Sequence, residues 1–136
     1  FSEAIRVTRP GGVVFVAYCM SDPSIVSYGF IRGEIHNLVE KSMLNTETFE
    51  TYSHPWDIFE LYRTEDIQHL RESFDVTPLH FIAADGYTYH MQNTVDQMDE
   101  ATYALYLKYH LATCERQDKI GYSNHTLDIF RKNISF

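Results

Sequence analysis

Histidine is the side chain in this sequence best suited to proton transfer near neutral pH, because its imidazole titrates there. The seven histidines stand at positions 36, 54, 69, 80, 90, 110 and 125. They form no H-x-x-x-H pair and have no neighbouring cysteine ligand, so the sequence predicts no zinc site. His90 ends the aromatic run Tyr87-Thr88-Tyr89-His90 and is the best candidate for a general base, with a solvated loop histidine as the alternative.

Two other histidines and the two cysteines have weaker claims to chemistry. His54 stands beside Pro55-Trp56, which makes it a candidate on a lid over a binding site. His110 falls on an apolar helical face, and this favours a core histidine. Cys19 and Cys114 are far apart and belong to no C-x-x-C motif, so we expect two reduced thiols in the core.

A helix, a tight turn and a buried strand are predicted at the start of the chain. Pro10 fixes its own φ and biases Arg9 away from helix, so the helix that contains Glu3–Ile5 must end there. The pair Gly11-Gly12 then permits a reversal of the chain. Val13–Tyr18 is an apolar run rich in β-branched residues, which predicts a strand covered on both faces, as in a parallel sheet flanked by helices.

The rest of the sequence predicts helices and strands within one domain, residues 1–136. The expected elements are a helix over 23–43, an ordered loop or short helix over 45–56, a short strand or turn over 58–62, a helix over 64–74, a strand over 75–84, a helix over 99–115 and a final strand over 126–132. Within the first of these helices, Gly29 and Gly33 mark either a close helix crossing or a break.

These residues resemble the second half of the class I S-adenosylmethionine-dependent methyltransferases. In that family a helix ending in a basic residue and Pro-Gly-Gly leads into the fifth strand of a seven-stranded sheet. The matching residues here are Glu3–Ile5, Arg9–Gly12 and Val13–Tyr18. The tail is similar to the C-terminal end of bacterial small methyltransferases, through Cys114–Asp118, Gly121, Ser123, His125 and Leu127–Lys132.

The resemblance implies an α/β fold, namely the last three strands of a Rossmann-like methyltransferase sheet with flanking helices and a helical lid insertion over 20–62. The last two strands of that sheet are antiparallel neighbours, and the helix over 99–115 is an insertion between them. The six glycines of this sequence never form the G-x-G-x-x-G pattern of a cofactor loop. We therefore interpret the chain as the C-terminal fragment of an enzyme that uses S-adenosylmethionine, with no cofactor-binding residue in the fragment itself.

The resemblance also places the methyl acceptor beneath the loop and helix that follow the first strand. The candidate substrate-binding residues are Tyr18, Cys19, Met20, Tyr28, His54 and Tyr87. For Tyr18 and Tyr28 the alternative is an aromatic core residue whose hydroxyl bonds to the backbone. His90 is the candidate catalytic residue, and Arg116 is expected to pair with a nearby acid such as Asp118 or Asp128 for structural reasons.

Composition narrows the class of partner. The chain has a formal net charge of −8 and scattered lysines and arginines, which argues against nucleic acid. It has no run of 18 apolar residues, so no membrane-spanning helix is expected. The resulting prediction is a cytoplasmic methyltransferase acting on an unidentified small molecule, with the fragment itself inactive.

Removal of the cofactor half would leave strand 13–18 with an exposed apolar edge, so we expect a homodimer or higher oligomer through that edge. Two alternatives to the methyltransferase remain open. One is a non-catalytic α/β module for protein interaction or ligand binding. The other is a nucleotide-dependent oxidoreductase of related topology, whose cofactor signature is equally absent.

Overall fold

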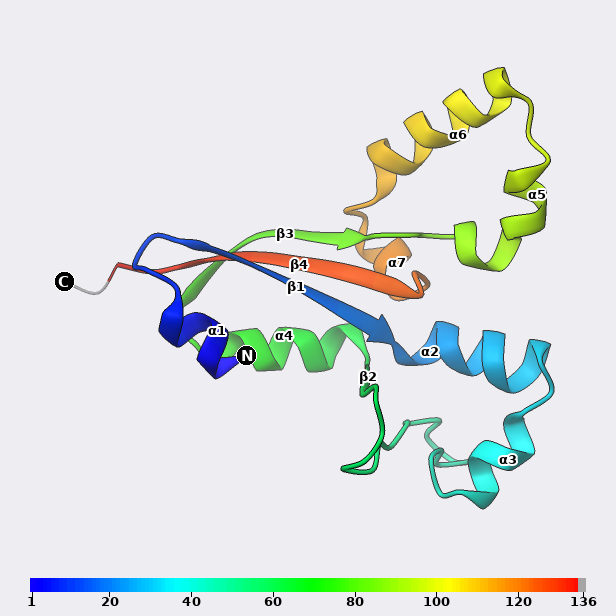
Figure 1. Cartoon of the computed structure of the whole chain (residues 1–136), viewed down its shortest axis with the longest axis horizontal. Coiled ribbons are helices and arrows are strands. Elements are labelled where there is room, and N and C mark those ends of the chain that lie inside the picture. Colours follow the sequence, from blue (N-terminus) through cyan, green and yellow to red (C-terminus); the bar gives the residue numbers. More distant parts are fainter. Residues whose placement is uncertain (135–136) are drawn as a thin grey trace.

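The structure is a computed structural model that describes residues 1–134, in which a mixed four-stranded sheet has helices along one side and at one end (Figure 1). The elements in chain order are α1 (Ser2–Val7), β1 (Val13–Met20), α2 (Ser21–Ser24), the π-helix η1 (Ile25–Ile31), α3 (Ile35–Glu40), β2 (Leu61–Tyr62), α4 (Thr64–Glu72), β3 (Val76–Ala83), the 3-10 helix η2 (Thr88–Met91), α5 (Gln92–Asp96), α6 (Glu100–Thr113), α7 (Gln117–Ile120) and β4 (His125–Lys132).

The predicted helix, turn and strand at the start of the chain are confirmed. The chain reverses at Gly11, whose φ of 77° is readily adopted only by glycine. The turn is hydrogen-bonded to the last residue of β4. Gly11 N donates to the Lys132 carbonyl at 2.8 Å, and Lys132 N donates to the Gly12 carbonyl at 2.9 Å. A side chain at Gly12 would clash, since its Cβ would lie 2.8 Å from the Arg9 carbonyl.

The strand order is β2-β1-β4-β3. β4 is antiparallel to both of its neighbours, and the short β2 is parallel to β1. The expectation that the last two strands pair antiparallel is therefore confirmed, and the inserted helix α6 does not disturb that pairing. β2 contacts only the end of β1, at Cys19 and Met20, so the edge of β1 over 13–18 has no strand beside it within the described residues.

The core lies beneath one face of the sheet. Tyr18 and Met20 of β1 pack with Ile67 of α4, and Phe1 and Leu70 pack against this cluster. Helices α1 and α4 lie on the same side of the sheet in Figure 1. The expectation that β1 is covered on both faces is wrong for the part of the chain described, because Phe15 on the opposite face is 64% exposed.

The single helix expected over 23–43 is also corrected. It is divided into α2, η1 and α3, with the break at Gly33, whose φ of 78° is left-handed. Gly29 serves the close crossing, because a Cβ there would lie 3.0 Å from Cδ1 of Ile35 on α3. The chain therefore uses both of its two glycines in this segment, one for the crossing and one for the break.

Helix α6 confirms the prediction over 99–115 in position, and Asp99 caps it by accepting a hydrogen bond from Thr102 N at 2.7 Å. The apolar face of this helix, which contains His110, was expected to be buried, and within the described chain it is not. On that face Leu107 and Leu111 are 41% and 73% exposed, and the helix projects away from the sheet in Figure 1. No helix within residues 1–134 is long and apolar enough to cross a membrane.

Candidate functional site

An apolar cleft of about 450 Å³ opens where β1 ends. This volume falls within the range of small-molecule sites, and ligands of open α/β sheets bind beyond the carboxyl ends of the strands. The residues that line it are Asp22, Pro23, Ile25, Val26, Phe30, Phe49, His90, Gly121 and Tyr122. They come from four segments that are far apart in the sequence, so the cleft exists only in the folded chain.

The first wall is the start of the insertion that follows β1. The helix α2 begins directly at the end of the strand, and within it the Ser24 hydroxyl donates to the Met20 carbonyl at 2.6 Å. Ile25 is 5% exposed and anchors η1, whereas Phe30 one turn later is 59% exposed at the cleft. Each hydrogen bond of a π-helix spans one more residue than a hydrogen bond of an α-helix. Short π-helical turns are frequent at functional sites.

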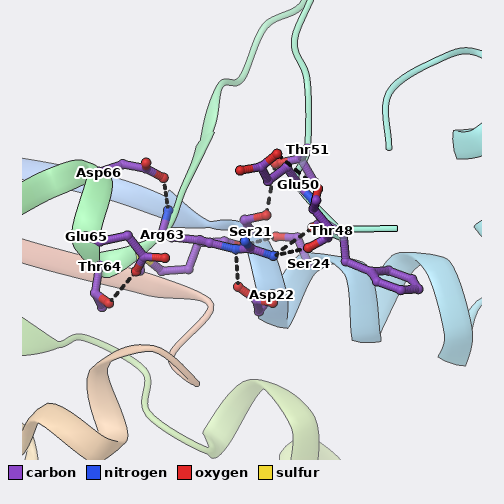
Figure 2. A network of polar contacts seen from close by, with 12 residues as sticks. Ser21, Asp22, Ser24, Thr48, Glu50, Thr51, Arg63, Thr64, Glu65 and Asp66 are labelled. Carbon is purple, nitrogen blue, oxygen red and sulfur yellow. Dashed lines mark hydrogen bonds and ion pairs between the residues drawn. The ribbon is translucent and has the colours of Figure 1, made fainter. Parts of the chain in front are cut away.

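The second wall is the segment 45–51, which carries Phe49 and is held in place by Arg63 (Figure 2). The Arg63 guanidinium donates from Nε to Asp22 Oδ2 at 3.0 Å, and from Nη2 to the carbonyls of Thr48 and Phe49 at 3.2 and 2.9 Å. The backbone N–H of Arg63 is bonded to Asp66, which fixes the residue at the start of α4. One side chain thus joins three segments around the cleft.

The third wall contains His90 and Tyr122, and a compact polar network holds this wall to the sheet. Ser123 is fully buried and donates to Asp85 Oδ1 at 2.6 Å, while Gly86 N donates to the Ser123 hydroxyl at 2.9 Å. His125 adds its backbone N–H and its ring Nδ1, at 3.0 and 2.8 Å from the two Asp85 oxygens. These contacts fix the turn that leads from β3 into η2, and therefore fix His90.

His90 is half-buried and lines the cleft, and its Nε2 atom is buried without a hydrogen-bond partner among the described residues. Because this nitrogen has almost no accessible surface, it is other atoms of the His90 ring that line the cleft. The other ionisable group in the lining is the Asp22 carboxylate, which is already bonded to Arg63. The cleft can therefore hold an apolar molecule and offer one imidazole to a polar group on it.

The sequence candidates separate into two groups in the structure. His90 lines the cleft, and Tyr87 lies next to it, with its ring centroid 6.5 Å from that of Tyr122. Tyr18 and Met20 are instead core residues beneath the sheet. Burial raises the pKa of the Tyr18 phenol, and its hydroxyl has no partner among the described residues, so the backbone bond considered as its alternative is not formed.

Cys19, Tyr28 and His54 take other positions. Cys19 faces His125 across the β1–β4 ladder, and burial raises the pKa of its thiol, which keeps it protonated at neutral pH. Tyr28 lies on η1 between cleft residues and is 40% exposed. His54 stacks on Trp56 with ring centroids 4.9 Å apart, and its Nδ1 lies 3.2 Å from Asp57.

Sequence reasoning missed Asp22, Phe30, Phe49 and Tyr122 as lining residues. The position of Asp22, two residues beyond a buried strand, is the one signal that was available, because such positions border ligand sites in α/β sheets. Nothing in the sequence around Phe49 indicates that Arg63 brings it to the end of β1.

Of two structural expectations at the periphery of the site, the pairing of Arg116 with an acid is confirmed, whereas His110 is only half-buried and is not a core histidine. Arg116 pairs with Asp118, with Nη2 2.7 Å from Oδ2, and both side chains are exposed. His110 is half-buried beside Lys119, and burial together with the lysine charge lowers its pKa. Within residues 1–134, no group of three or more histidine, cysteine, aspartate or glutamate side chains could hold a metal ion.

Comparison of the sequence with models of known protein families gives no match, and comparison with curated proteins gives none either. The site must therefore be interpreted from its own geometry.

Proposed function

We propose that this chain is the acceptor-side, C-terminal part of an S-adenosylmethionine-dependent methyltransferase that acts on a small molecule. The observation that carries the proposal is the apolar cleft at the carboxyl end of β1, with His90 among the residues that line it. Methyl transfer requires mainly that the acceptor be held in line, with a base added where the acceptor must lose a proton. A shaped apolar cleft with one imidazole meets both requirements.

The arrangement of strands supports the same proposal. A helix, a Pro-Gly-Gly turn and a strand occur in the order that the methyltransferase resemblance requires, and the last two strands are antiparallel neighbours. On this proposal, β1, β4 and β3 are the far end of a Rossmann-like sheet and the segment 20–62 is the lid on the acceptor side. Both cysteines are free, which agrees with a reducing, cytoplasmic compartment.

The described residues do not fit S-adenosylmethionine itself. In the turn Gly11-Gly12, the Gly11 N–H and the Gly12 carbonyl are already hydrogen-bonded to the backbone of Lys132, so they are not free to bind the cofactor. Gly86 N is bonded to Ser123, and a Cβ at Gly86 would lie 2.8 Å from Cε of Lys119, so no open glycine cradle exists there. The cofactor, which supplies an electrophilic methyl group, would be held by other residues of a longer protein.

Within this chain, the roles are acceptor binding and proton acceptance. Phe30 and Phe49 hold the acceptor and exclude water from it, and Arg63 keeps the second of these walls closed. His90 is the base that takes the proton from the acceptor hydroxyl or amine. Asp85 positions His90 indirectly, by fixing the turn before η2.

The open edge of β1 supports a further element of the proposal, self-association. Residues 13–18 carry no charge, and Phe15 beside this edge is 64% exposed. Two such edges can pair antiparallel about a two-fold axis normal to the sheet, which would extend the sheet across a homodimer. The exposed edge of β1 and the exposed helix α6 also favour the second candidate function. That function is a non-catalytic α/β module for protein interaction or ligand binding.

The test is calorimetric binding of S-adenosylmethionine by this chain and by a version extended upstream through its open reading frame. We expect binding by the longer protein alone, and methyl transfer by the longer protein that His90→Gln lowers by about 10²-fold or more. Failure of both proteins to bind would refute the methyltransferase and favour the interaction module.

A further inference from the structure

The residues that line the cleft restrict the chemical class of its ligand. The inference rests on the proposed function only in calling that ligand the methyl acceptor. We propose that the cleft binds a flat aromatic molecule that carries no anionic group. Shape and charge each contribute to this assignment.

The shape is set by aromatic rings from three separate segments. Phe30, Phe49 and Tyr122 line the cleft and are 59%, 41% and 63% exposed, although large apolar side chains gain most from burial. Three exposed rings around one cavity offer stacked or edge-on contacts to a flat ring between them. An aliphatic chain would leave those ring-to-ring contacts unmade.

The charge in and around the lining excludes an anion. The one carboxylate there, Asp22, is 58% exposed, and it is matched by a single guanidinium, that of Arg63. This guanidinium already donates to Asp22 and to the carbonyls of Thr48 and Phe49. A carboxylate or phosphate on the ligand would therefore lose its hydration without gaining a cation among the residues that line the cleft.

The experiment uses 2-naphthol and 2-naphthoate as probes, which share a flat ring system and differ in charge. The chain is titrated with each in the absence of S-adenosylmethionine, and binding is followed by amide shifts in a ¹⁵N-labelled sample. We expect 2-naphthol to shift the amides of 22, 24–30, 49, 90 and 121–122, and to bind at least about tenfold tighter than 2-naphthoate.

The paired substitution Phe30→Ala and Phe49→Ala should weaken 2-naphthol binding by about tenfold or more, because two ring contacts are lost. The matched control is Phe59→Ala, since Phe59 follows Phe49 in the same insertion and is 65% exposed. We expect that control to leave the affinity unchanged. Equal affinity for the two probes, shifts elsewhere on the chain, or no saturable binding would each overturn the inference.

Because these measurements need no cofactor, they separate the two proposals. Binding of 2-naphthol to the cleft, with no methyl transfer by the extended protein, would refute the methyltransferase and leave the ligand assignment standing. Methyl transfer to another class of acceptor, with no binding of 2-naphthol, would do the reverse.

Discussion

Arg63 should control whether the second wall of the cleft stays closed. Its guanidinium makes three hydrogen bonds, at 3.0 Å to Asp22 and at 3.2 and 2.9 Å to the carbonyls of Thr48 and Phe49. Hydrogen bonds of charged groups contribute about 1.5–3 kcal/mol each when buried. Because the side chains of Arg63 and Asp22 are 24% and 58% exposed, we discount this to about 1 kcal/mol per bond, or about 3 kcal/mol in all.

The perturbation is Arg63→Met, which keeps most of the apolar stem and removes the guanidinium. The assay is amide hydrogen exchange at Asn45, Phe49 and Tyr52, whose N–H groups bond within the segment at 2.8–2.9 Å. A loss of about 3 kcal/mol from local opening should accelerate their exchange by about 100-fold. Exchange in the middle of β1 should not change, since that strand is held by β4.

The matched control is Arg116→Met. Arg116 also makes two bonds to a carboxylate, at 3.0 and 2.7 Å, but it and Asp118 are 62% and 67% exposed and it joins no distant segments. Such a pair contributes little, so exchange at the three amides should stay within about twofold. Unchanged exchange in Arg63→Met would refute the reasoning, because the bridge between Leu44 and Thr51 would then suffice to hold the segment.

Three further outcomes are expected. Asp128→Asn should lower the free energy of unfolding, measured by urea titration, by about 2–4 kcal/mol. The reason is that Asp128 is fully buried and its partner Arg71, 2.7 Å away, would keep an uncompensated charge. A loss below about 1 kcal/mol would contradict this. The pKa of His110 is lowered in the folded chain, so the unfolded chain binds the proton more readily, and the melting temperature should fall as the pH drops below the ordinary pKa of 6.5. The substitution His110→Gln should reduce this dependence of the melting temperature on pH. An unaltered dependence would contradict the assignment. Light scattering should find the chain dimeric and Phe15→Lys monomeric, whereas a monomeric parent chain would exclude the β1-edge dimer.

Local signals in the sequence predicted the three long strands and the helices α1, α4 and α6, but not η2, α5 or α7. The Pro10-Gly11-Gly12 turn, the acidic start of α4 and the Asp99 cap are set by residues within a few positions of one another. The same kind of reasoning failed where a distant contact decides the outcome. The apolar residues of α6 were expected to be buried, but periodicity does not say whether a surface exists to receive them.

The site was predictable only in part for the same physical reason. His90 could be selected because a histidine that follows a strand is a chemical signal in itself. Tyr18 and Met20 lie at the correct end of β1, but the alternation of side chains along a strand turns both toward the core. Phe49 reaches the cleft through Arg63, a contact across 14 positions that no local pattern encodes.

The cleft and the core of this chain depend on different interactions, and this separation matters for function. The core is built from Tyr18, Met20 and Ile67 beneath the sheet, whereas the cleft walls are attached by Arg63 and by the network around Ser123. The bonds of Arg63 are at partly exposed positions and are weaker than core packing, so the wall that carries Phe49 should open locally without global unfolding. A binding site that must admit and release a small molecule needs an opening that costs little free energy. Here the wall can open while the sheet that positions His90 stays folded.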